Sequence, residues 1–432
     1  MTDELPLVRV DRTRLWANLM ELKEIGGFDD AATGLRGVRR LALTDEDAQA
    51  RRLVVEWMRE AGLTVRVDRI GNVFGRREGT EPDLPCVLLG SHIDTVRDAG
   101  HYDGNLGVVA AIEAVAALHE AGERLPFAVE VIAFGDEEGV RFPSKLTGSR
   151  AVAGTFEPQS LDITDQQGMP LEAALRAFGC DPAAIPGIGR RKDQVLGYVE
   201  MHIEQGPVLE ERKLPVGIVS AIAGASRFRI EVVGEAGHAG TVPMDLRHDA
   251  LTAAAEMILA VERRAHGAAE PGLVATVGAV QAFPGAPNVI PGRVSFALDI
   301  RAPSDADRQR AIDELVAAFA TLADRRHVRV KVEKFYDEPA VTCDPALVEQ
   351  LAAAVQRAGI APHRLPSGAG HDGLAIAALC PITMLFVRCK GGISHNPAES
   401  ITVKDADVAT GILLDFLRHF EGAAHVAPAV AA

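Results

Sequence analysis

Apolar stretches that end in polar residues recur along this chain and alternate with a helical pattern. PCVLLGSHIDTV (85–96) and FAVEVIAFGDEEG (127–139) flank LGVVAAIEAVAALHEAG (106–122), which has the length and composition of a helix. LGYVEMHIEQGP (196–207) and ITMLFVRCKGGISHNP (382–397) repeat the apolar run with a polar end. Because strand, helix and strand in succession are typical of an α/β fold, we expect a mixed central sheet flanked by helices.

Two patterns near the N-terminus add to this sheet. TDEDAQARRLVVEWMREAG (44–62) predicts a helix, with Thr44 or Asp45 as N-cap, an acidic first turn, and Gly62 at its end. TVRVDRIGNVFGRR (64–77) alternates apolar and polar residues around a Gly-Asn pair, which predicts an antiparallel strand pair.

The pattern changes between residues 220 and 336. Strand and helix patterns follow there in the order β-α-β-β-α-β, with helices expected in 246–267 and 306–325. This order is typical of a ferredoxin-like α+β unit with an antiparallel sheet. We therefore expect a catalytic domain in two parts, 1–219 and 337–432, and an inserted domain at 220–336.

Composition excludes several classes of function. The 432 residues are 47% hydrophobic and 24% charged, which is typical of a globular protein. The formal net charge of −15 repels nucleic acids and anionic membranes, so we expect neither as a partner. A small anionic substrate remains compatible, because a local arginine or metal cluster can reverse the field in a cleft.

Cysteine usage and hydropathy indicate the cellular compartment. The five cysteines are odd in number and form no CxxC pair, which favours a reducing cytoplasm over a disulfide framework or a thiolate metal site. The first 15 residues have no apolar stretch of the signal-peptide type. No window approaches the roughly 20 apolar residues that a bilayer span requires.

Metal-binding side chains gather where the apolar runs end. The candidate ligands are His92, Asp103, Glu138, His202 and His395. Imidazole and carboxylate together suit Zn, Mn, Co or Ni better than Mg or Ca, and a pair of such ions can activate water at neutral pH. These residues are far apart in sequence and match no local H-E-x-x-H spacing, and a histidine alone at a strand end is more often a surface or core residue.

A set of motifs in order along the chain points to a known family. The motifs are SHIDTV, YDGNLGV, GDEEGVRF, MHIEQGPVLE, GHAGTVPM, NVIPG, DIR, SGAGHD and GGISHNPAES. Together they resemble the amidase (hydantoinase/carbamoylase) branch of the M20 family of metallohydrolases, from residue 18 to residue 417. This branch contains allantoate amidohydrolases, N-carbamoyl-L-amino acid hydrolases and β-ureidopropionases.

The resemblance implies roles for residues of the first domain. Two divalent ions per subunit would be held by the five candidate ligands, with Asp103 bridging and with Glu138 and His395 completing the second position. Glu137 would be the general base that takes a proton from the attacking water and later gives it to the leaving nitrogen. Asp94 would hold His92 in the correct tautomer.

The resemblance also implies that the inserted domain is a lid or dimerisation domain of a homodimer. His238 would stabilise the oxyanion, commonly in the partner's active site. Asn288 and Arg301 would bind the substrate carboxylate, for which a guanidinium fork is well shaped. Gln205 and His371 match motifs near the substrate. The plain alternatives are a surface role for Arg301, a turn at Asn288 and a tight loop at His238.

The substrate within this branch is less constrained by the motifs. GDEEGVRF, GHAGTVPM and RCKGGISHNPAES resemble allantoate-type members, so we expect hydrolysis of the terminal ureido group of allantoate to ureidoglycine, ammonia and carbon dioxide. The alternatives are an N-carbamoyl-L-amino acid or β-ureidopropionate. An inactive relative is disfavoured because Glu137 and every proposed ligand are present.

Overall fold

The computed structural model describes residues 8–31 and 33–422, and it divides the chain into two compact units. Of the described residues, the first unit contains 8–31, 33–220, 343–365 and 371–422, and the second contains 221–342 and 366–370. The second unit extends beyond the expected range of 220–336. One reason is that residues 366–370 bond back to it, through Ala223 N–H to the Ser367 carbonyl and through Arg301 to the Gly368 carbonyl.

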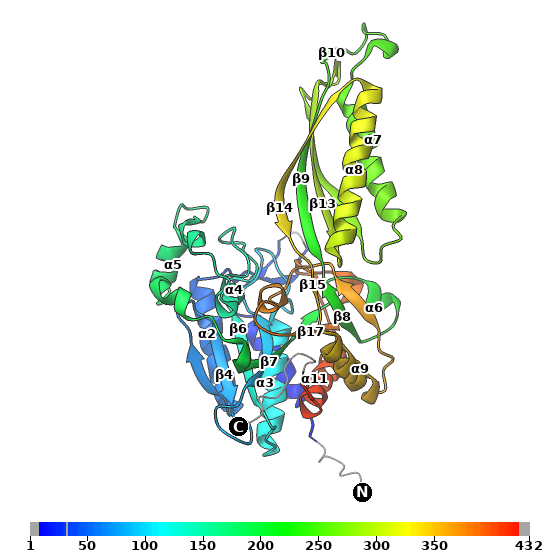
Figure 1. Cartoon of the computed structure of the whole chain (residues 1–432). Coiled ribbons are helices and arrows are strands. Elements are labelled where there is room, and N and C mark those ends of the chain that lie inside the picture. Colours follow the sequence, from blue (N-terminus) through cyan, green and yellow to red (C-terminus); the bar gives the residue numbers. More distant parts are fainter. Residues whose placement is uncertain (1–7, 32, 423–432) are drawn as a thin grey trace. The chain divides into compact units, whose positions relative to one another are not determined.

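The first unit is built on a large mixed sheet (Figure 1) with the strand order β15-β8-β17-β7-β5-β6-β4-β3, and β16 pairs with β8. The strands of this sheet are β3 (Thr64–Val67), β4 (Val73–Arg77), β5 (Cys86–His92), β6 (Ala128–Phe134), β7 (Val195–Ile203), β8 (Val216–Ile222), β15 (Val341–Thr342), β16 (Arg364–Ser367) and β17 (Ile382–Val387). A separate strand pair is formed by β1 (Gly27–Asp29) and β2 (Arg36–Val38).

The centre of the sheet is parallel, and its flanks are antiparallel. Strands β17, β7, β5 and β6 run in the same direction, whereas β8 runs against β17 and β4 runs against β6. Strands β5 and β6 are buried along their whole length, as expected for central strands covered on both faces. The parallel strands therefore end at the same edge of the sheet, where α/β proteins bind ligands.

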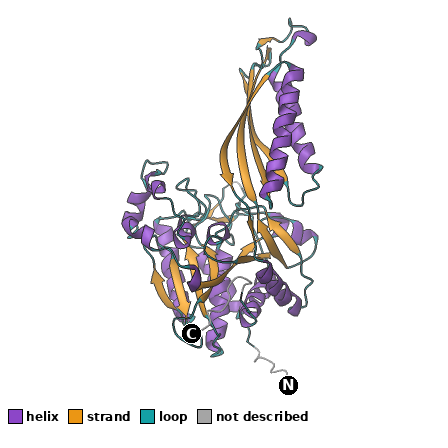
Figure 2. Ribbon diagram, viewed as in Figure 1, coloured by secondary structure: helices purple, strands orange, loops and turns teal. Residues whose placement is uncertain are grey.

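Helices cover this sheet, and short 3-10 turns connect some of its elements (Figure 2). The helices of the first unit are α1 (Arg12–Leu22), α2 (Asp45–Glu60), α3 (Asn105–Glu120), α4 (Thr147–Ala153), α5 (Leu171–Ala177), α6 (Val208–Glu211), α9 (Pro345–Arg357), α10 (Gly373–Ile376) and α11 (Val403–Arg418). The 3-10 turns of this unit are η1 (Pro158–Asp162), η2 (Pro182–Gly187), η3 (Lys192–Gln194) and η5 (Lys390–Gly392).

Two of these helices illustrate how the sequence directs the fold. Helix α2 begins after Thr44, whose hydroxyl accepts the Asp47 N–H at 3.4 Å, which confirms the predicted cap. Helix α3 is apolar on nearly all sides because it packs against β5, β6, β7 and α11 at once. No helix in the described residues has both the length and the apolar character needed to cross a bilayer.

The second unit is an antiparallel sheet with two long helices on one face (Figure 2). Its elements are β9 (Gly224–Val233), β10 (Gly237–His238), η4 (Met244–Leu246), α7 (Ala250–His266), β11 (Val274–Phe283), β12 (Val289–Ile290), β13 (Arg293–Ala302), α8 (Asp305–Arg326) and β14 (Arg329–Glu338). The main strands follow the order β11-β13-β9-β14, and the helices pack against β9, β11, β13 and β14. This arrangement has the β-α-β-β-α-β succession that the sequence predicts.

Candidate metal centre

The ends of β5 and β7 bring two buried histidines to one carboxylate. His92 is the last residue of β5, and His202 lies one residue before the end of β7. Their Nε2 atoms lie 3.5 Å and 3.1 Å from Oδ1 of Asp103, which precedes helix α3. Both histidines are almost fully buried, with 2% and 1% of their surface exposed.

The other oxygen of Asp103 faces a second group of side chains. Oδ2 of Asp103 lies 3.2 Å from Nε2 of His395, which itself lies 3.6 Å from Oε1 of Glu138. Glu138 follows strand β6, and His395 lies in the loop after β17. Three sets of potential ligand atoms therefore lie close together: His92, Asp103 and His202; His92, Glu137 and Glu138; and Asp103, Glu138 and His395.

A glycine allows Asp103 to reach this position. Gly104 has a φ of +65°, which favours glycine, and it caps the start of helix α3. A Cβ atom at Gly104 would lie 2.4 Å from the ring of His92. Any side chain here would push the turn that carries Asp103 away from His92, so the approach of the two ligands depends on this glycine.

The tautomers of the two buried histidines fit metal binding. Nδ1 of His92 lies 3.0 Å from the Asp94 carbonyl, and Nδ1 of His202 lies 2.9 Å from the Ile203 carbonyl. A carbonyl can only accept, so each neutral ring carries its proton on Nδ1. Each Nε2 then has the lone pair that a metal ligand requires, and that of His202 accepts the Gly104 N–H at 3.2 Å.

The electrostatics of the cluster also favour a cation. Burial raises the pKa of Glu137 to about 7, and burial together with the Asp103 charge raises that of Glu138 to about 8. The hydrogen bond to Asp103 raises the pKa of His395 to about 9. Three carboxylates at close range repel one another unless positive charge lies between them, and divalent ions with nitrogen and oxygen ligands supply that charge.

Asp94 differs from the expected geometry. Its carboxylate lies 3.7 Å from Nδ1 of His92, beyond hydrogen-bond distance, and the backbone carbonyl of Asp94 makes the contact with the ring instead. The carboxylate accepts the backbone N–H groups of Glu137 and Glu138 at 3.2 Å and 3.3 Å. Asp94 therefore positions the turn of the expected base and ligand, and holds His92 through its main chain.

Gln205 and His371 lie beside the ligands. Nε2 of Gln205 donates to Oδ2 of Asp103 at 2.7 Å, and Gln205 has a φ of +57°. The buried ring of His371 packs edge-on against that of His202, with 4.5 Å between centroids. Burial lowers the pKa of His371 well below its usual value, so the ring is neutral. Both side chains contact ligands directly, which supports an orienting role in addition to the expected substrate contact.

His238 and Asn288 lie together in the second unit. His238 in β10 pairs with Val289 in β12, and the Asn288 carbonyl accepts the Ala239 N–H at 3.0 Å. Nδ1 of His238 accepts the Gly240 N–H at 3.1 Å, so the proton of the neutral ring is on Nε2. His238 is exposed and presents an N–H donor of the kind that can stabilise an oxyanion.

Arg301 is held by an acidic neighbour on the same strand. Its Nε and Nη2 donate to the two oxygens of Asp299 at 2.8 Å and 3.1 Å, and its Nη1 donates to the Gly368 carbonyl at 2.7 Å. Arg227 donates to Asp299 as well, at 2.8 Å. A guanidinium has five N–H donors, so two remain for a substrate carboxylate. The edge of the Arg301 guanidinium formed by Nε and Nη2 is therefore occupied by Asp299 and not free for the substrate.

Several residues that support the site were missed by the sequence analysis. They are Ser91, Glu200, Asp299, Ser394 and Glu399. Glu200 is buried below the site and accepts the Ser91 hydroxyl at 2.8 Å and the Gly373 N–H at 3.2 Å. Spacing along the strands could have identified two of them. Glu200 lies two positions before His202, and Asp299 lies two positions before Arg301, so each pair shares one face of its strand.

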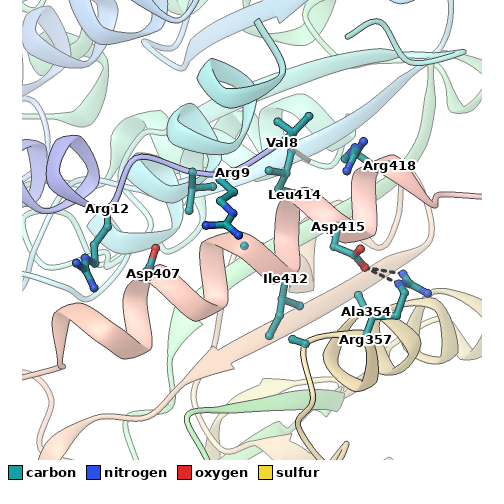
Figure 3. A pocket seen from close by; sticks show the side chains of 13 residues that line it. Val8, Arg9, Arg12, Ala354, Arg357, Asp407, Ile412, Leu414, Asp415 and Arg418 are labelled. Carbon is teal, nitrogen blue, oxygen red and sulfur yellow. Dashed lines mark hydrogen bonds and ion pairs between the residues drawn. The ribbon is translucent and has the colours of Figure 1, made fainter. Parts of the chain in front are cut away.

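A different hollow lies among the N-terminal segment, α9 and α11 (Figure 3). Its volume is about 510 Å³, and Arg357 and Asp415 form an ion pair at 2.7 Å across part of it. None of the candidate ligands lines this hollow. The cluster around Asp103 is therefore the candidate site.

Comparison with known proteins shows similarity over most of the chain. Residues 88–419 match the pattern of the peptidase family M20/M25/M40. The chain is 43% identical over 400 residues to an N-carbamoyl-L-amino acid amidohydrolase of Geobacillus stearothermophilus, covering 93% of this chain and 96% of the relative. It is 41% identical over 425 residues to allantoate deiminase of Arabidopsis thaliana, covering 92% and 80%.

A solved structure with a similar fold is an amidase of the hydantoinase/carbamoylase family from Burkholderia multivorans. The TM-score is 0.89 at 37% sequence identity, and the match covers 95% of this chain and 98% of the amidase. The similarity therefore extends over both units in sequence.

Proposed function

Because this chain belongs to the peptidase family M20/M25/M40 and is a hydrolase of C–N bonds, we propose that it is a two-metal amidohydrolase of a small ureido acid. The proposed substrate is allantoate. The reaction hydrolyses one terminal ureido group to ureidoglycine, ammonia and carbon dioxide. The metals are two divalent ions per subunit, drawn from Zn, Mn, Co and Ni.

The arrangement of Asp103 is the observation that carries this proposal. One oxygen faces His92 and His202, and the other faces His395. A carboxylate in this position can bridge two cations, and Glu138 completes the second group. The mixture of imidazole and carboxylate ligands suits Zn, Mn, Co or Ni better than Mg²⁺ or Ca²⁺, which prefer oxygen alone.

Glu137 is the proposed general base. Its Oε2 lies 3.8 Å from Nε2 of His92, at the side of the ligand cluster, and its backbone is fixed by Asp94. It takes a proton from the attacking water and delivers it to the leaving ureido nitrogen. The bound ions would supply Lewis acidity, which lowers the pKa of water and polarises the ureido oxygen.

The residues of the second unit would recognise the rest of the substrate. The Nε2–H of His238 would stabilise negative charge on the ureido oxygen, either in its own subunit or in the partner of a homodimer. Asn288 and the two remaining N–H donors of Arg301 would bind the substrate carboxylate. Gln205 and His371 would act beside the ligands they contact. The second unit is proposed to serve as lid and dimerisation domain in a cytoplasmic protein.

The surroundings of Arg301 support allantoate over the alternatives. Within the second unit its partners are the carboxylate of Asp299 and the carbonyl of Gly368, and Arg227 lies next to them with its guanidinium 4.7 Å from the ring centre of Tyr336. These groups suit the second, polar ureido group of allantoate better than an apolar amino acid side chain. The relative from Geobacillus keeps an N-carbamoyl-L-amino acid as the second candidate, and β-ureidopropionate as the third.

A substrate panel tests the proposal. Purified protein loaded with manganese, zinc or cobalt is given allantoate, several N-carbamoyl-L-amino acids and β-ureidopropionate, and ammonia release is measured. We expect the highest kcat/KM on allantoate and no turnover after chelation. A higher kcat/KM on a carbamoyl amino acid would contradict the assignment of allantoate as substrate. Absence of turnover on the whole panel would contradict the proposed function.

A further inference from the structure

Glu399 is a buried carboxylate outside the ligand set that contacts the turn carrying Asp103. It is 2% exposed. Its Oε1 accepts the backbone N–H of Tyr102 at 2.7 Å and that of Asp103 at 3.2 Å. These two peptide groups set the direction of the Asp103 side chain, although Glu399 lies almost 300 positions later in the chain.

The other oxygen of Glu399 contacts the loop that carries His395. Oε2 lies 3.1 Å from the hydroxyl of Ser394, which is also 2.9 Å from Oδ2 of Asp103. One hydroxyl proton can serve only one of these carboxylates at a time, so Ser394 lies between them. The Glu399 carboxylate therefore contacts both the turn that carries Asp103 and, through Ser394, the loop that carries His395.

The loop after β17 needs such an anchor. Gly391 and Gly392 have φ values of +64° and +66°, which glycine adopts readily, whereas His395 has a φ of +53°, which a residue with a side chain adopts only when its surroundings hold it there. The bends place His395 opposite Asp103 and Glu138. Among the described residues no cation pairs with Glu399, so hydrogen bonds to the two turns are what stabilise its carboxylate.

We infer that Glu399 is a positioning residue of the second metal position, where its carboxylate holds the Asp103 turn and the His395 loop at the separation that one ion requires. The inference rests on the proposed metal centre. It goes beyond that centre because it attributes the positions of Asp103 and His395 to Glu399, a residue that is not a proposed ligand. Residues that orient ligands in this way typically change metal affinity by about 10–100-fold when replaced.

The test compares three substitutions of Glu399 in the full-length protein. Glu399→Ala removes all three hydrogen bonds. Glu399→Gln keeps an acceptor for the two N–H groups and offers its amide N–H to Ser394, so it should restore the wild-type behaviour. Glu399→Asp keeps the charge but is one methylene too short to reach both turns.

Asp344→Ala is the matched control. Asp344 is also a buried carboxylate, and it accepts two backbone N–H groups, of Ala346 and Leu347, at the start of helix α9. Its loss should lower the melting temperature without changing metal binding. Metal content is measured by mass spectrometry during competition with a graded chelator, and the coordination of bound Co²⁺ is followed by its visible absorption.

We expect Glu399→Ala and Glu399→Asp to weaken one of the two ions about 10–100-fold and to lower kcat with KM nearly unchanged, and Glu399→Gln to lie within about threefold of wild type. Combining Glu399→Ala with His395→Ala should weaken metal binding no further than His395→Ala alone, because both act on one position.

Other outcomes overturn the inference. Wild-type affinity for both ions in Glu399→Ala and Glu399→Asp would overturn it. Equal weakening of both ions in these variants would also overturn it, because that result indicates general destabilisation. An impaired Glu399→Gln protein together with wild-type behaviour of Glu399→Asp would show that charge matters rather than position. If Glu399→Ala does not fold, Glu399→Asp and Glu399→Gln carry the comparison. A wild-type protein that binds fewer than two ions would instead contradict the proposed function itself.

Discussion

The two halves of the ligand cluster are built from different kinds of structure. His92 and His202 lie on adjacent, fully buried strands, and their rings are fixed by backbone carbonyls. His395 lies on a loop with a positive φ, and 49% of its side chain is exposed. Glu138 follows a strand but is only partly buried. Asp103 is the residue shared by the set with His92 and His202 and the set with Glu138 and His395.

The two proposed metal positions therefore differ in rigidity. Strand positions are fixed by the sheet and by close packing, so the first position is formed before an ion arrives. The second position depends on hydrogen bonds that hold a loop, above all those of Glu399 and Gln205. We therefore expect the ion beside His395 to be held more weakly and to exchange faster.

The largest expected effect leaves both positions intact. Glu137→Gln removes the proposed base but none of the five ligands, so both ions should remain bound. We expect kcat to fall by about 10²–10⁴-fold, because proton transfer by a positioned group contributes that much. Steady-state kinetics and metal analysis on the same sample check this, and a variant with unchanged kcat would refute the assignment of Glu137.

His238→Ala should have the next largest effect. Loss of one oxyanion donor lowers kcat by about 10²–10³-fold, while metal content should not change. Mixing His238→Ala with Glu137→Gln should restore part of the activity if His238 acts in the partner subunit. Absence of rescue would show that His238 acts within its own chain or has no catalytic role.

Removing one ligand from each group tests the comparison directly. His395→Ala should retain about one ion per subunit, because the buried position keeps His92, Asp103 and His202. His202→Ala should weaken both ions, since Asp103 then loses the neighbour that lies 3.1 Å away and orients its shared carboxylate. Metal counts after dialysis check this, and equal loss in the two variants would remove the distinction between the positions.

The smallest expected effect concerns pH. Without metal, the pKa of His395 is raised to about 9, and an imidazole must lose its proton to bind an ion. The apparent affinity of the second position should therefore rise as pH increases from 6 to 9, by up to about tenfold per unit for each proton released, one from His395 and one from Glu138, whose pKa is raised to about 8. Chelator competition at several pH values measures this slope, and affinity independent of pH would contradict the role of His395.

The sequence predicted the central strands because each strand depends on a local pattern, and it proposed candidate ligands at their polar ends. Apolar runs with polar ends identified strands β5, β6, β7 and β17, and the polar ends named His92 and His202. Asp103, Glu138 and His395 were candidates from their residue types near other strand and loop ends, and the family motifs then supplied a role for each. The structure adds that the potential ligand atoms of each of the three sets lie within 4.8 Å of one another.

The supporting contacts could not be predicted because they join distant parts of the chain. Glu399 bonds to a turn almost 300 residues earlier, and no periodicity links the two. The role of Asp94 was assigned to its carboxylate, whereas its carbonyl holds His92 and its carboxylate holds the Glu137 turn. The choice between side chain and main chain depends on backbone direction after β5, which residue types alone do not determine.

The most direct test of the account is anomalous diffraction from crystals of the metal-loaded protein. We expect two peaks roughly 3.5–4 Å apart, bridged by Asp103, with His92 and His202 on one ion and Glu138 and His395 on the other. The peak beside His395 should have the lower occupancy at limiting metal. A single peak, or two ions that do not share Asp103, would contradict it.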